Sequence, residues 1–195
     1  MLMVNIMLKH YPKEMARYDI RSKPGSKEKI LDRVAKAAYD NDRAYEGCAR
    51  CVLAALHHHL HLTDDEREFK GALKASTGLA AGIARKGETC GALIGAIMAV
   101  GLVEGTEHLD DFDGYVKTME AATKVFDEFK KHFGTVKCFE IQEKLLGRHY
   151  DFWKDEDAEA WYKDGGLDVC PGVCAIAARI AAEVIFTLQK EEDKM

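Results

Sequence analysis

Six cysteines are the residues of this 195-residue sequence that could most readily do chemistry. They are Cys48, Cys51, Cys90, Cys138, Cys170 and Cys174. Such thiols can be small buried apolar residues, can bind a metal, or can cycle between thiol and disulfide. The Cys48–Cys51 pair is not followed by His, as haem attachment requires. Neither the paired Cys-x-x-Cys motifs of a zinc ribbon nor the compact ferredoxin spacing occurs, so spacing alone leaves the three roles open.

Three of the cysteines are expected at the starts of helices. Thr89 is expected to cap a helix with Cys90 in its first turn, and Thr135 to cap another with Cys138 at its third position. Cys170 precedes a proline, which favours a cap-like conformation where the final helix begins. Free N–H groups and the helix dipole favour negative charge at such ends, so these positions suit a thiolate of low pKa or a metal-bound thiolate.

The other three cysteines are expected within helices. Cys48 is expected inside a helix and on its apolar face. Cys51 follows it by three residues and Cys174 follows Cys170 by four, so each pair shares a helix face. Cys51 and Cys174 are interpreted as packed core residues or as additional ligands.

The elements that position these cysteines are predicted to be helical, because apolar residues recur at spacings of three and four. In the first half of the chain the signals are a turn and cap at 24–26, an apolar face from Ile30 to Ala38, a helix ending near Leu60, and a capping box from Thr63 to Glu66. An irregular segment at 77–87 follows, and then close-packing glycines at Gly91 and Gly95. The second half has a final helix from Cys170 to Leu188 and, before it, an amphipathic helix over 112–133 whose apolar stripe is Val116, Met119, Ala122, Phe126, Phe129 and Phe133. We therefore expect an all-α, single-domain bundle of about six to eight helices over residues 1–195, with 1–25 as an irregular arm.

Composition narrows the class of protein. The chain is 47% hydrophobic and 31% charged, as globular proteins are, and its net charge is −5. No long basic run occurs, so nucleic acid is not the expected partner. The apolar stretches at 1–8 and 90–103 are too short to cross a bilayer, so we expect no membrane span and a cytoplasmic protein. Structural disulfides are uncommon in that compartment.

Several motifs match one known pattern. They are Gly-Cys-Ala-Arg at 47–50, the small-residue loop at 78–85, Gly-Glu-Thr-Cys-Gly-Ala-Leu at 87–93, a cysteine soon after Phe-Gly at 133–138, and a cysteine that opens an Ala-rich segment at 170–178. Together, over roughly 42–184, they resemble the C_GCAxxG_C_C family of redox-active proteins. Ala80, Ala81 and Ala84 stand where that family often has glycine, which predicts a stiffer loop.

The resemblance implies a cysteine-ligated cofactor. The recurring family cysteines fall on Cys48, Cys90, Cys138 and Cys170, and a related domain in split-Soret cytochromes is associated with an iron–sulfur centre. The resemblance therefore implies an iron–sulfur cluster, [2Fe–2S] or [4Fe–4S], held by these four residues, and a homodimer. The expected function is electron transfer with a redox partner protein.

Two alternatives remain open at this point. The first is a metal-free thiol–disulfide protein or peroxide sensor in which Cys90 or Cys48 is the thiolate of low pKa. The second is an interaction subunit, either zinc-stabilised or without a cofactor. The sequence does not establish whether the protein is an enzyme. A run of histidines, His57, His58, His59 and His61, is interpreted as the solvated end of a helix.

Overall fold

The computed structural model describes residues 27–192, and this part of the chain is built from α-helices and one short 3-10 helix. The elements are α2 (Lys27–Tyr45), α3 (Cys48–Leu60), α4 (Glu66–Ala75), η1 (Ser76–Leu79), α5 (Gly91–Glu104), α6 (Phe112–Phe133), α7 (Cys138–Leu146), α8 (Asp155–Lys163) and α9 (Gly166–Glu192). The all-α prediction is confirmed. The expected arm at 1–25 and the expected turn and cap at 24–26 lie outside the described residues.

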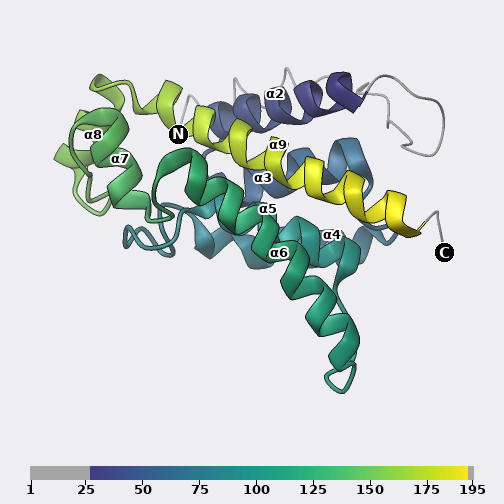
Figure 1. Ribbon diagram of the computed structural model, residues 1–195. Helices are drawn as coiled ribbons and strands as arrows, with labels where there is room; N and C mark the ends of the chain where they lie inside the picture. Colours follow the sequence, from purple (N-terminus) through teal and green to yellow (C-terminus); the bar gives the residue numbers. More distant parts are fainter. Residues whose placement is uncertain (1–26, 193–195) are drawn as a thin grey trace.

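Helix α9 lies at the centre of the bundle. It packs against α2, α3, α5 and α6, and Figure 1 shows it alongside α2. Its buried face is rich in alanine, and these small residues let the neighbouring backbones approach closely. The stretch Gly166–Gln189 is also long and apolar enough to cross a membrane, with half of its window buried in the bundle. A core helix needs the same composition, so the stretch alone does not indicate a span.

Two glycines join α5 to the start of α3. A Cβ atom on Gly95 would overlap the backbone oxygen of Ala49, and one on Gly91 would overlap the sulfur of Cys48. The predicted close approach at these glycines is therefore confirmed, and the approaching backbone belongs to α3. The contact brings the N-termini of α3 and α5 together.

Helix α6 has the predicted bounds but a different buried face. Its buried residues are Ala121, Val125 and Phe129, whereas Val116 and Met119 of the predicted stripe are exposed. The stripe fails in the N-terminal half because that half extends beyond the other helices, as Figure 1 shows. This half of α6 therefore presents apolar side chains to solvent.

The cap of α4 differs from the predicted box. Asp65, not Thr63, is the N-cap, and its carboxylate accepts a 2.7 Å hydrogen bond from the backbone N–H of Arg67. Thr63 lies two residues earlier, where its hydroxyl donates to Glu68 and accepts from the Asp65 N–H. The predicted capping box of Thr63 and Glu66 therefore does not form, and Thr63 instead contacts Glu68 outside the helix cap.

The histidine run is not the solvated helix end that we predicted. His57, His58 and His61 are half-buried, and His59 is buried. Burial lowers the pKa of His59 to about 4, and the neighbouring His58 and Arg33 lower it further. His59 is therefore neutral at pH 7, because the end of α3 packs into the bundle.

Candidate functional site

Five of the six cysteines line one pocket of about 710 Å³, at the end of the bundle where α7, α8 and the start of α9 gather (Figure 1). They are Cys48, Cys90, Cys138, Cys170 and Cys174. All six cysteines are free thiols. The fold thus brings the four family cysteines together from four different helices, α3, α5, α7 and α9.

Cys48 is not inside a helix, as we predicted, but is the first residue of α3. The preceding residues Glu46 and Gly47 both have positive φ, 54° and 94°, so the chain turns sharply between α2 and α3. Periodicity did not reveal this break, because the apolar spacing continues across it. The thiol of Cys48 therefore lies at a helix N-terminus.

Cys90 and Cys138 lie at helix starts as predicted, but each is shifted. Cys90 is itself the N-cap of α5, one residue beyond the predicted Thr89 cap. Cys138 is the first residue of α7, not the third. Thr135 lies before the helix, where its hydroxyl donates to Glu140.

Cys170 was predicted to begin the final helix, but it lies within α9. The helix begins at Gly166, after Gly165 turns the chain at φ 90°, so Cys170 is its fifth residue. Pro171 is tolerated inside the helix, although its missing N–H leaves one early helical bond unmade. Three family cysteines still lie at helix starts, with Cys48 in place of Cys170.

A short backbone pairing fixes Cys90 beside Cys138. The N–H of Cys90 donates to the oxygen of Val136 at 2.8 Å, and the N–H of Cys138 donates to the oxygen of Glu88 at 2.7 Å. Thr89 and Lys137 form an antiparallel bridge between these two bonds. This pairing sets the relative position of the two thiols before any cofactor is considered.

Backbone N–H groups face the sulfurs of Cys48 and Cys90. The amide of Ala81 in the loop after η1 favours the thiolate of Cys48. The amides of Ala92 and Leu93, in the first turn of α5, do the same for Cys90. An N-cap side chain normally accepts from these two positions, and the Cys90 sulfur lies near them without making a cap hydrogen bond of ordinary geometry.

Side-chain N–H groups face the other two family cysteines. The amide nitrogen of Gln142 donates to the sulfur of Cys138 at 3.7 Å, and the amide oxygen of Gln142 accepts from the Tyr150 N–H at 3.1 Å. The indole N–H of Trp161 is buried, has no partner of ordinary geometry among the described residues, and favours the thiolate of Cys170. An N–H group thus lies near each of the four family sulfurs, and the one at Cys138 makes a hydrogen bond of ordinary geometry, so we call these four the acceptor cysteines.

Cys51 and Cys174 behave differently, because their thiols are donors. The sulfur of Cys51 donates to the backbone oxygen of Glu46 at 3.4 Å. Cys174 is hydrogen-bonded to the carboxylate of Asp42, which can only accept in its ionised form. The structure therefore separates the cysteines into four acceptors and two donors.

Asp42 is a site residue that sequence reasoning missed. It is buried on α2 and lines the pocket. Burial raises the pKa of Asp42 to about 6, although the bond from Cys174 opposes this shift. The signal was present in the sequence, since Asp42 continues the apolar row of Ile30, Val34 and Ala38 at a spacing of four.

Burial also changes the expected acidity of the thiols. It raises the pKa of Cys90 and of Cys170 to about 12 each, and it raises the pKa of Cys48 and of Cys138 as well. A neighbouring family cysteine contributes to the raised pKa of each of the four, and Cys90 acts on both Cys48 and Cys138. The prediction that helix N-termini yield a thiolate of low pKa is therefore wrong for the metal-free pocket, because desolvation outweighs the N–H groups.

The loop between η1 and α5 forms one wall of the pocket in an unusual conformation. Ala81, Ile83, Ala84 and Arg85 all have positive φ, between 50° and 61°, and Gly82 has φ 74°. Consecutive left-handed residues cost free energy when they carry a Cβ atom. The alanines that replace family glycines thus hold a strained turn, which places the Ala81 N–H near Cys48.

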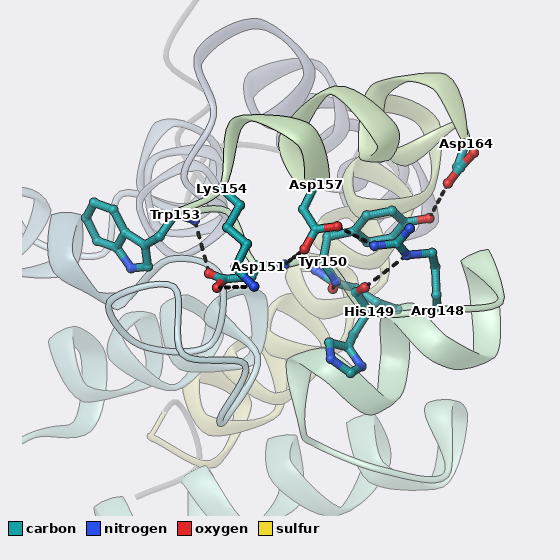
Figure 2. Close-up of polar contacts among 9 residues, drawn as sticks. Arg148, His149, Tyr150, Asp151, Trp153, Lys154, Asp157 and Asp164 are labelled. Atoms are coloured by element: carbon teal, nitrogen blue, oxygen red, sulfur yellow. Dashed lines mark hydrogen bonds and ion pairs between the residues drawn. The ribbon is translucent and has the colours of Figure 1, made fainter.

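A network of polar contacts between α7 and α8 holds the segment that carries Trp153, which lines the pocket (Figure 2). Arg148 pairs with Asp157, and the buried Tyr150 donates its hydroxyl to Asp164 at 2.8 Å. The N–H of Trp153 donates to Asp151 at 3.1 Å. Within this charged segment, Tyr150 and Trp161 are buried.

Two contacts connect the network between α7 and α8 to the loop between η1 and α5. The indole N–H of Trp153 donates to the oxygen of Ala84 at 3.3 Å, and the Arg85 guanidinium donates to the oxygen of Phe152 at 3.0 Å. The same guanidinium lies 5.1 Å from the Trp153 ring centroid. The loop and the network are therefore tied together at Trp153.

The side chains are not arranged to hold a single metal ion. Within residues 27–192, no group of three or more His, Cys, Asp or Glu side chains has the spacing that such an ion requires. The pocket that the four family cysteines help to line is larger than the volume of one ion.

Comparison with known proteins identifies the family. A family model described as "Putative redox-active protein (C_GCAxxG_C_C)" matches residues 46–184. The chain belongs to this family. The C_GCAxxG_C_C match includes all four acceptor cysteines, the strained loop and the network around Trp153, while Asp42 lies just outside it. No curated protein and no solved structure matches the chain significantly.

Proposed function

We propose that this C_GCAxxG_C_C protein binds an iron–sulfur cluster through Cys48, Cys90, Cys138 and Cys170 and uses it for electron transfer. The observation that carries the proposal is the division of the cysteines into acceptors and donors. Thiolate ligands of iron–sulfur clusters accept N–H hydrogen bonds, which adjust their reduction potential. Among residues 27–192, N–H groups lie near these four sulfurs and near neither of the other two.

The acidity of the pocket supports a metal cofactor over a metal-free thiol. Cys90 and Cys138 are buried and Cys48 and Cys170 are half-buried. Desolvation raises the pKa of all four thiols, so they stay protonated at pH 7 unless a cation replaces their protons. The thiol–disulfide alternative needs a reactive thiolate of low pKa, whereas the pKa values of these thiols are raised. When bound, the cluster would supply one-electron chemistry in a site shielded from water.

The volume of the pocket supports a polynuclear cluster over a single zinc ion. Thiolate ligands of a cluster bind different iron atoms and are further apart than ligands of one ion. The four family cysteines line one end of a pocket of about 710 Å³, and within the described residues they do not form a single-ion site. The zinc-stabilised alternative is therefore disfavoured.

Anaerobic purification tests the proposal. We expect a brown protein that contains iron and acid-labile sulfide in comparable amounts, with a visible charge-transfer absorption that dithionite bleaches and an EPR signal in one oxidation state. A colourless protein that takes up neither iron nor sulfide on anaerobic reconstitution would contradict the proposal. Far-ultraviolet circular dichroism of the same sample shows whether the helices are intact.

A further inference from the structure

The cysteines account for only one end of the pocket. Cys90, Cys138 and Cys174 are buried at its floor, whereas Trp153 and Tyr162 at its rim are 63% and 47% exposed. A volume of about 710 Å³ lies within the range of roughly 300–1,000 Å³ that holds drug-sized ligands. The pocket therefore offers room for a small molecule between its floor and its rim.

The exposed rings at the rim are held in place. The hydroxyl of Tyr162 donates to the carboxylate of Glu46 at 2.6 Å. The Trp153 indole is bound to the oxygen of Ala84 and lies beneath the Arg85 guanidinium. In Figure 2 the Trp153 ring points away from Asp151 and Lys154. Fixed aromatic faces at a pocket mouth bind flat rings with little loss of conformational entropy.

The rim also carries positive charge that is not neutralised by direct ion pairs. Arg50 donates to the backbone oxygens of Glu46 and Tyr45, and Arg85 donates to that of Phe152. Within the described part of the chain, neither guanidinium has a carboxylate oxygen within ion-pair distance. Both residues line the pocket and would attract an anionic group.

We propose that the pocket binds a planar conjugated small molecule with an anionic substituent, of the quinone or flavin class. Its ring would stack on Trp153 at the rim, and its anionic group would meet Arg85 or Arg50. The inference depends on the proposed function in one respect, which is that the bound ring would lie next to the iron–sulfur cluster.

Intrinsic fluorescence gives a direct test with anthraquinone-2-sulfonate, a flat sulfonate whose ring does not add thiols. The chain has two tryptophans, Trp153 and Trp161, and both line the pocket. We expect saturable quenching at one molecule per chain, in the iron-loaded and the iron-free protein. Cyclohexanesulfonate, which carries the charge without the flat ring, should not compete.

Matched variants locate the binding. Stacking on an aromatic side chain contributes about 1–3 kcal/mol, so Trp153→Leu should weaken binding by roughly 5- to 150-fold, read from the remaining Trp161 emission. Phe112→Leu removes a ring that is 70% exposed on α6, away from the pocket, and should leave the dissociation constant unchanged. Arg85→Gln should weaken binding of the sulfonate without altering the helix content. Each variant is checked by circular dichroism before titration.

Three results would overturn the inference. They are quenching that never saturates, equal binding by wild type and Trp153→Leu, and displacement by cyclohexanesulfonate. The two proposals fail separately. A protein that loads no iron yet binds the ring contradicts the cluster alone, and a protein that loads iron without saturable ring binding contradicts this inference alone.

Discussion

Gly91 of α5 lies directly against the sulfur of Cys48 on α3. A Cβ atom there would overlap that sulfur and would come within 2.7 Å of the oxygen of Leu79. We expect Gly91→Ala to displace the Cys48 thiol and to reduce iron incorporation at least severalfold. The amount of iron and sulfide per chain after anaerobic reconstitution measures this.

Gly101 provides the matched control, because it lies on the same helix and a Cβ atom there meets nothing within 4 Å. Gly101→Ala should retain full iron content and should stabilise α5 by roughly 0.5–1 kcal/mol. Normal loading of Gly91→Ala would show that the contact does not position Cys48.

The pair Cys170 and Cys174 tests the division between acceptor and donor cysteines, since the two lie one turn apart on α9. Cys170→Ser should abolish or strongly alter the visible and EPR spectra, because oxygen is a poorer ligand for iron than thiolate. Cys174→Ser should leave both spectra nearly unchanged, because a serine hydroxyl can still donate to Asp42. Equal loss from both variants would make Cys174 a ligand as well.

The helices of this bundle were predictable, and most of their ends were not. The Phe112–Phe133 helix was predicted with its correct bounds because Gly134 adopts φ 71° and ends it. The start of α3 was missed because periodicity continues through Glu46 and Gly47, although the chain does not. Helix ends depend on single backbone angles, which apolar spacing does not report.

The four family cysteines were predicted from motifs, but their surroundings were not. The backbone pairing that joins Cys90 to Cys138 links residues almost fifty positions apart and has no local signal. Asp42 does have a signal, a charge within an apolar row, and it could have been identified from the sequence. The acidity of the thiols depends on burial, which becomes visible only once the helices are packed.

Asp42 should make the stability of the iron-free protein depend on pH. Burial raises the pKa of Asp42 from 3.8 to about 6, so the folded state binds its proton more tightly than the unfolded state. The contribution of Asp42 to the free energy of unfolding is therefore fully present below pH 4 and is lost as the pH rises through 6. A shift of about two units corresponds to a loss on the order of 3 kcal/mol.

Comparison with Asp42→Asn isolates this contribution. Urea unfolding between pH 4 and 7.5 should show wild type losing stability relative to the variant up to about pH 6 and then levelling off. His59 titrates in both proteins, so its effect cancels in the difference. A difference that stays constant over this range would show that Asp42 does not keep its proton.

The exposed half of α6 should mediate the expected homodimer. Phe112, Tyr115 and Met119 are between 49% and 70% exposed and lie on consecutive turns of the helix that extends from the bundle. Phe112→Glu combined with Met119→Lys should therefore yield a monomer in light scattering coupled to size exclusion. Lys36→Glu on the exposed face of α2 serves as the surface control. A wild-type protein that is already monomeric at high micromolar concentration would contradict the prediction.

A substitution in the strained loop between η1 and α5 should stabilise the protein. Ala84 has φ 51° and is exposed, so its methyl group gives little packing in return for its left-handed conformation. That conformation costs about 1–2 kcal/mol for a residue with a Cβ atom, while glycine loses about 0.5–1 kcal/mol of chain entropy. Ala84→Gly should therefore raise the free energy of unfolding by roughly 0.5–1 kcal/mol. Ala35→Gly, the same change in the middle of α2, should lower it by about 1 kcal/mol. Urea unfolding of both variants measures the difference, and equal destabilisation by the two would show that the loop is not strained at Ala84.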